Sequence, residues 1–65
     1  MHKNYIVKFV RKDNLPDEEY IYHSHQDAEH HFSLFRHDDS GIYKKIEMLS
    51  WFGNITAIIK EISFV

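Results

Sequence analysis

A chain of 65 residues has room for one small domain, which we take to span residues 1–65, and it has little apolar surface to bury. Its 43% hydrophobic and 15% aromatic content excludes a disordered chain, while a formal charge of −2 gives no overall attraction to nucleic acid or anionic lipid. Cysteine is absent, so disulfide bonds cannot compensate for the small core, and good packing, a metal site or association must do so.

The N-terminal third predicts two strands joined by a turn. Residues Tyr5–Arg11 alternate apolar and mixed positions with the period of a strand, and Glu18–His23 predicts a second strand. Between them, residues 12–17 contain Asp, Asn and the only Pro, which favour a chain reversal. An antiparallel register that combines aromatic contacts with an ion pair places Phe9 opposite Tyr20, Val7 opposite Tyr22, and Arg11 opposite Glu18.

A helix is predicted next, from His25 to His37. Ser24 followed by Asp27 three residues later resembles a capping box, and Asp38–Gly41 ends the periodic pattern. Arg36 and His37 stand where a helix C-terminus favours cations. The apolar stripe expected to face the sheet consists of Ala28, His31, Phe32 and Phe35.

The stretch Ile42–Val65 predicts a β-hairpin around a two-residue turn at Gly53-Asn54, because Gly suits the positive φ of the first position in a type II′ turn. A helix from Ile55 to Ile62 with Asn54 as its cap is the competing interpretation, but the β-branched content favours a strand. Counting outward from the turn pairs Phe52 with Ile55, Trp51 with Thr56, Leu49 with Ile58, Met48 with Ile59, Glu47 with Lys60, and Tyr43 with Phe64.

The order ββαββ predicts an α+β fold, with a small antiparallel or mixed four-stranded sheet and one helix packed on one face. We expect Phe32 and Phe35 to cover the face that carries the small pair Ser50 and Ala57. The other face then lacks cover within the chain, unless strong twist and the first hairpin cover it locally. Five residues form the predicted partner-binding surface: Tyr43, Leu49, Trp51, Ile58 and Phe64.

The sequence therefore predicts a non-enzymatic protein-interaction module that forms a homodimer or binds another protein. The alternative is a single-stranded nucleic-acid-binding domain that stacks bases on sheet tyrosines beside basic residues. Its expected contact residues are Tyr5, Lys8, Tyr20, Tyr22, Lys44 and Lys45. Interspersed glutamates and the absence of an RNP-like motif weigh against this alternative.

Other site chemistry finds less support. His2, His23, His25, His30, His31 and His37, together with Asp27, include metal-ligand residue types, but their spacing matches no metal motif, and we expect no metal. No nucleophile motif or glycine-rich phosphate loop occurs, so we expect no catalytic residues, cofactor or small-molecule substrate. Without a signal-peptide pattern or a long apolar run, a cytoplasmic protein that does not bind membranes is expected.

Overall fold

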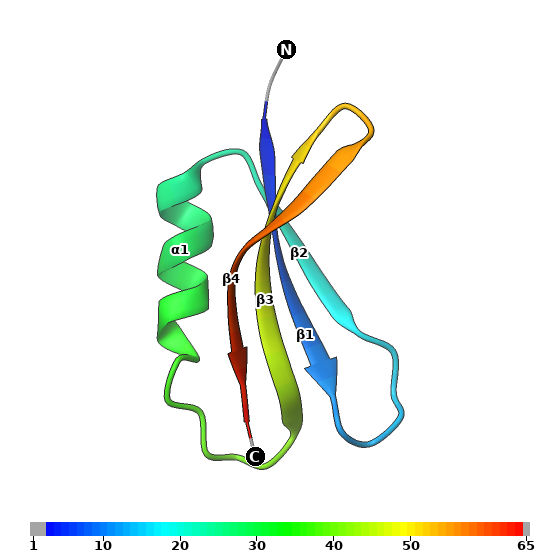
Figure 1. The fold of residues 1–65 in the computed structure, drawn as a ribbon. Helices are drawn as coiled ribbons and strands as arrows, with labels where there is room; N and C mark the ends of the chain where they lie inside the picture. The colour runs from blue at the N-terminus through cyan, green and yellow to red at the C-terminus, as the bar shows by residue number, and fades with distance from the viewer. Residues whose placement is uncertain (1–2, 65) are drawn as a thin grey trace.

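The described part of the chain forms four antiparallel strands and one helix in the order ββαββ, which confirms the predicted small α+β fold (Figure 1). The computed structural model describes residues 3–64, so the predictions for His2 and Val65 lie outside the described residues. The strands form one open sheet in the order β2-β1-β3-β4, and all of its pairings are antiparallel. The elements are β1 (Asn4–Arg11), β2 (Glu18–Tyr22), α1 (His25–Leu34), β3 (Tyr43–Phe52) and β4 (Ile55–Ser63).

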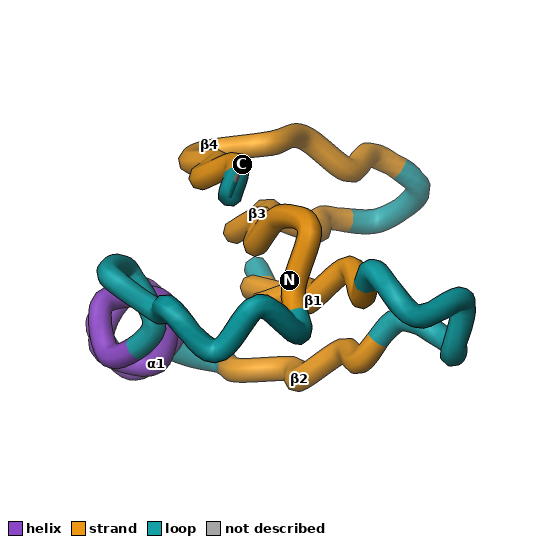
Figure 2. The backbone as a smooth tube through the Cα atoms, turned by 90° about the horizontal axis from the view of Figure 1, so that it is seen from below, coloured by secondary structure: helices purple, strands orange, loops and turns teal. Residues whose placement is uncertain are grey.

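The helix lies on one face of the sheet, which we call the helix side, and no other helix or strand among residues 3–64 covers the opposite, outer face (Figure 2). It packs against β1, β2 and β3, while its backbone stays away from β4. Apolar side chains from the helix and the two central strands fill the space between the layers. The buried core consists of Val7, Phe9, Ala28, Phe32, Ile46 and Met48.

The pairing of β1 with β2 differs from the predicted register by two residues. Val7 lies opposite Tyr20 and Phe9 opposite Glu18, so the predicted pairs are wrong. A shift of two keeps every side chain on its predicted face. Phe9 and Tyr20 therefore still meet, with ring centroids 5.7 Å apart, and Arg11 still reaches Glu18 at 2.9 Å. The loop between the strands does not fix their register, and the sequence could not choose between positions two residues apart.

The helix begins as predicted and ends earlier. Ser24 is the N-cap, and its side chain accepts a hydrogen bond from the Asp27 backbone N–H at 3.5 Å. At the other end, Phe35 is the C-cap, and its N–H donates to the Phe32 carbonyl at 3.3 Å. This shorter-range bond tightens the last turn, so Arg36 and the residue after it lie in a turn and not in the helix, contrary to the prediction.

The second hairpin confirms the strand interpretation and the turn. Gly53 has φ +61°, while Asn54 does not have a positive φ, as a type II′ turn requires. Next to the turn the predicted register is correct: Phe52 pairs with Ile55, Trp51 with Thr56, Ser50 with Ala57, and Leu49 with Ile58.

Beyond this point a β-bulge between Met48 and Leu49 shifts the register by one residue. Met48 lies opposite Lys60 and not Ile59, and Glu47 opposite Glu61 and not Lys60, so both predicted pairs are wrong. The Tyr43–Phe64 pair is also wrong, because the Phe64 N–H donates to the Lys44 carbonyl at 2.9 Å. The bulge has a packing reason: it turns Ile62 toward the core, where it lies opposite the buried Ile46.

Candidate functional site

Large apolar side chains remain exposed at the end of the second hairpin. We call them the hairpin-tip patch, and their exposed fractions are 38% for Trp51, 41% for Phe52, 70% for Ile55, 55% for Ile58 and 39% for Ile59. In Figure 1 this end of the hairpin, coloured gold and orange, projects beyond the helix. Ten helical residues span ~15 Å and the ten residues of β3 ~33 Å, so the helix cannot cover the whole strand.

The patch occupies both sides of the sheet. Alternation along the ladder puts Trp51 and Ile58 on the outer face, and puts Phe52 with Ile55 on the helix side beyond the helix. The Trp51 indole N–H donates to the Gly53 carbonyl at 2.8 Å, so its one polar atom is satisfied within the hairpin. What Trp51 offers to a partner is therefore the apolar surface of its ring.

The five residues predicted to bind a partner do not share one face. Leu49, Trp51 and Ile58 lie together on the outer face, as expected. Tyr43 and Phe64 instead pack against the core from the helix side, and the Tyr43 ring lies 5.1 Å from that of Phe9. Bulges next to Tyr43 and at Met48 reverse the alternation on which the expected grouping depended.

Three residues of the hairpin-tip patch were missed because they were expected beneath the helix: Phe52, Ile55 and Ile59. The signal that could have found them is length. Even the predicted helix of thirteen residues spans only ~20 Å, well short of a strand that continues to the turn. The exposed surface therefore lies at one end of the sheet and not over one whole face.

Strand β4 is also an edge of the sheet, because among residues 3–64 only β3 lies beside it. Every residue from Ile55 to Glu61 is exposed. Charged side chains protect only its second half, where Lys60 reaches across to Glu29 on the helix at 2.8 Å and Glu61 follows. Residues 55–59 carry no charge. The unpaired backbone groups and apolar side chains of this half of the edge therefore lack the usual protection against strand pairing.

One row of side chains across the outer face is charged. Glu47 is only 7% exposed there, and its carboxylate lies 3.6 Å from the Lys45 amine. Lys8 lies opposite Glu47 on β1 and pairs with Asp17 at 3.5 Å. Beside this charged row, the strand register places four apolar side chains next to one another across the outer face and so connects the hairpin tip with the far edge: Ile58, Leu49, Ile6 and Ile21.

The structure divides the predicted nucleic-acid-binding residues between two faces. Tyr5, Tyr20 and Tyr22 lie on the helix side: the Tyr5 ring lies 5.3 Å from that of His25, and the Tyr22 hydroxyl lies 2.7 Å from His31 Nδ1. Lys8 and Lys45 lie on the outer face in the ion pairs described above, and Lys44 is exposed at a bulge. The tyrosines and these two lysines therefore form no common surface.

The histidines of the described region do not converge. Within residues 3–64, no group of three His, Asp or Glu side chains has a geometry that could hold a metal ion. His31 instead packs within an aromatic cluster of Phe9, Tyr20, Tyr22 and Phe35. Burial lowers the pKa of His31, and the neighbouring charge of His30 lowers it further.

The carboxylates with shifted pKa values belong to ion pairs that stabilise the fold. A hydrogen bond from Arg11 lowers the pKa of Asp13 to about 2, and the same guanidinium lowers the pKa of Glu18. The hydrogen bond from Lys60 lowers the pKa of Glu29. The Arg11 group closes the first hairpin, while the Lys60–Glu29 pair joins β4 to the helix.

No protein-family model matches this chain, and comparisons with curated proteins and with solved structures find no significant match. Within the described residues, no helix has the length and apolar character needed to cross a membrane. The fold and surface define a small α+β protein with an open antiparallel sheet and an apolar, exposed hairpin end.

Proposed function

We propose that this protein is a self-associating interaction module in which β4 pairs with β4 of a second copy. One observation carries the proposal: the first half of an edge strand is exposed, uncharged and apolar on both sides of the sheet. A strand added at this edge satisfies unpaired backbone groups and at the same time brings side chains against both sides.

The chemistry of the edge favours a second copy as the occupant. A suitable partner strand must carry apolar side chains on both of its faces, and residues 55–59 of this chain supply such a segment. An antiparallel pairing centred on Ile58 places Ile58 against its copy and Thr56 against Lys60 of the other copy. Pairing centred on Lys60 or Glu61 would place like charges opposite one another, which disfavours those registers.

Trp51 would flank this interface on the outer face, next to Ile58. Its large rigid ring loses little conformational entropy on binding, which is why Trp is enriched at positions that dominate binding energy. The absence of enzymatic activity and a cytoplasmic location, both expected from the sequence, remain predictions within this proposal.

Light scattering across a dilution series tests the proposal directly. We expect a molar mass of about twice the 7.9 kDa of one chain that falls toward one chain on dilution. Ile58→Lys places a charge at the centre of the pairing and should give a folded monomer at every concentration. The matched control is Ile21→Lys, because Ile21 is 58% exposed on the other edge strand, close to the 55% of Ile58, and should leave the dimer intact.

A wild-type protein that stays monomeric at millimolar concentration would contradict pairing with a second copy. Equal loss of the dimer in both lysine variants would show that association depends on general surface apolarity and not on β4. Circular dichroism of each variant checks that the fold is retained.

A further inference from the structure

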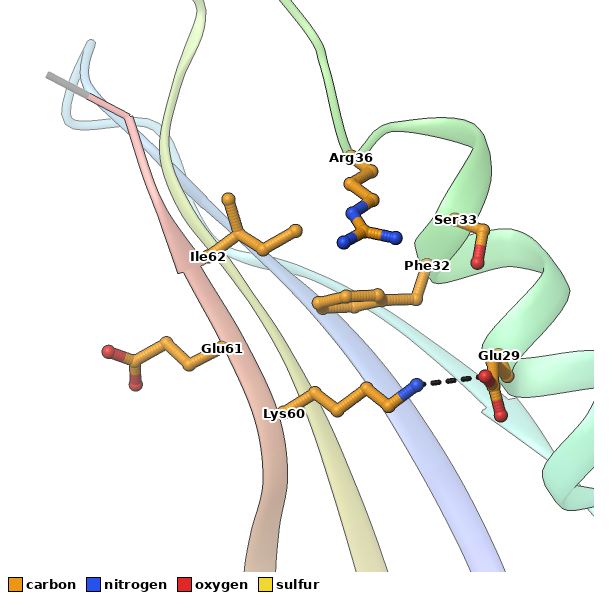
Figure 3. A pocket seen from close by; sticks show the side chains of 7 residues that line it. All are labelled: Glu29, Phe32, Ser33, Arg36, Lys60, Glu61 and Ile62. Atoms are coloured by element: carbon orange, nitrogen blue, oxygen red, sulfur yellow. Dashed lines mark hydrogen bonds and ion pairs between the residues drawn. The ribbon is translucent and has the colours of Figure 1, made fainter.

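A groove of about 380 Å³ lies between the helix and β4 (Figure 3). It exists because the helix packs against the other three strands and leaves β4 separated from it. The buried ring of Phe32 and the half-buried Ile62 provide apolar surface, and Ser33 adds a hydroxyl at the side. Its volume falls within the ~300–1,000 Å³ of small-molecule sites.

Two cations and two carboxylates line the groove, and one of the cations faces the groove without an opposing carboxylate (Figure 3). Lys60 and Glu29 neutralise each other through a contact of 2.8 Å that joins the two walls. Glu61 points away from the helix, whereas the guanidinium of Arg36 is turned toward the space above Phe32 (Figure 3). The groove therefore combines apolar surface with a single positive charge.

Arg36 differs in this respect from Arg11. Arg11 donates to both Asp13 and Glu18 in the first hairpin. Within residues 3–64, no carboxylate forms an ion pair with Arg36 and no acceptor receives a hydrogen bond from its side chain. Its planar guanidinium is thus available for the two parallel hydrogen bonds that a carboxylate accepts.

We propose that this groove binds a small amphipathic monocarboxylate, an alkyl or aryl acid, with its carboxylate on Arg36 and its apolar body against Phe32 and Ile62. A single unpaired cation matches a single negative charge, and the apolar surface favours a ligand with a hydrophobic body over a bare inorganic anion. The groove shares Lys60 with the proposed β4 pairing, but the ligand contacts proposed here are Arg36, Phe32 and Ile62, so the proposal does not depend on self-association.

Titration of isotope-labelled protein with 3-phenylpropionate, followed by amide chemical shifts, tests the site. We expect saturable shifts confined to residues 29–36 and 60–62, with a dissociation constant on the order of 1 mM for a fragment of this size. The alcohol 3-phenylpropanol and the amine 3-phenylpropylamine, which lack the negative charge, should bind at least about fivefold more weakly.

Arg36→Gln should weaken 3-phenylpropionate binding at least about fivefold and leave the folded amide spectrum unchanged, because Arg36 is exposed. The matched control is Lys12→Gln, which removes one positive charge from an exposed loop outside the groove and should leave binding unchanged. Acetate should bind more weakly than 3-phenylpropionate, since it lacks the apolar body.

The same titration on Ile58→Lys separates this site from the proposed dimer, because the groove should bind the acid equally well in the monomer. Shifts outside the groove, non-saturating shifts, equal binding of the amine, or unchanged affinity in Arg36→Gln would each overturn the carboxylate site.

Discussion

The two edges of this sheet differ in how they avoid unwanted pairing. The β2 edge is a strand of five residues that contains Glu18 and Glu19, and an ionic group around Arg11 closes its loop. The β4 edge is nine residues long, and its first half lacks both charge and cover. Protection of β4 appears only where it passes the helix, through Lys60 and the bulge at Met48.

This difference shows how a short helix divides one hairpin into two parts. Near the helix, Ile46, Met48 and Ile62 pack against the core, so their apolar character is explained by folding. At the tip, folding buries little of Trp51, Phe52 and Ile55. Apolar residues that stability does not require are the ones that indicate association.

The largest expected contrast is between two phenylalanines on different parts of the sheet. Phe9 is 1% exposed and Phe52 is 41% exposed. Phe9→Ala should lower the free energy of unfolding by ~3–5 kcal/mol, enough to leave most molecules of a domain this small unfolded. Phe52→Ala should lower it by less than ~1 kcal/mol. Urea unfolding followed by circular dichroism measures both, and equal losses would contradict the division of the hairpin into a packed part and a tip.

The turns of the two hairpins offer the next contrast, because each contains one residue with a positive φ: +63° at Asn14 and +61° at Gly53. Gly53→Val should destabilise the fold by more than ~1 kcal/mol. The cause is backbone strain at the positive φ and not a steric clash, because a Cβ at this position would meet no other atom within 4 Å. Asn14→Gly should be close to neutral. If urea unfolding shows no loss for Gly53→Val, the turn assignment is wrong.

Trp51→Lys tests whether the tip acts in association and not in stability. Because Trp51 is 38% exposed beyond the helix, we expect a change below ~1 kcal/mol in the free energy of unfolding and loss of the dimer by light scattering. Global unfolding of a protein shown to be monomeric would make Trp51 a core residue and remove it from the interface.

Acidification should reduce stability in two stages. The pKa of His31 is lowered in the folded state, so the unfolded chain gains a proton more readily than the folded chain as the pH falls below about 6.5, and stability decreases. The pKa values of Glu18, Glu29 and Asp13 are also lowered, so their stabilising contribution is lost as the pH falls from about 4.5 toward 2. Urea midpoints at pH 7.5, 5.5 and 3 measure both stages.

Variants assign the first stage to one histidine. His31→Gln should remove the loss between pH 7.5 and 5.5 and retain the loss at lower pH, while His37→Gln, in the exposed turn after the helix, should retain both. Persistence of the first stage in His31→Gln would assign it to another group.

The smallest expected effect concerns nucleic acid. Because the tyrosines and the lysines at positions 8 and 45 lie on opposite faces, mixed-sequence single-stranded oligonucleotides at low salt should cause little change in protein fluorescence. Binding that weakens steeply with salt and with Tyr20→Ala would instead support the alternative function.

Most of the fold was accessible from local patterns. Alternation identified the strands, Ser24 marked the helix start, and Gly53 gave both the turn and the correct pairing of the residues beside it, because a two-residue turn fixes register locally. The register of β1 with β2 was not accessible, because positions two residues apart present the same faces and the loop allows either.

The sequence by itself determined the order of the elements, the type II′ turn and the excess of apolar residues in the second hairpin. Only the tertiary structure decided which of those residues remain exposed. Two bulges reversed the alternation near Tyr43 and Met48 and turned Tyr43 and Phe64 into the core. The helix ended at Leu34 and packed over three strands, which left the tip and the β4 edge uncovered. Bulges and helix placement depend on how side chains from distant segments fill one core, and local sequence does not specify that packing.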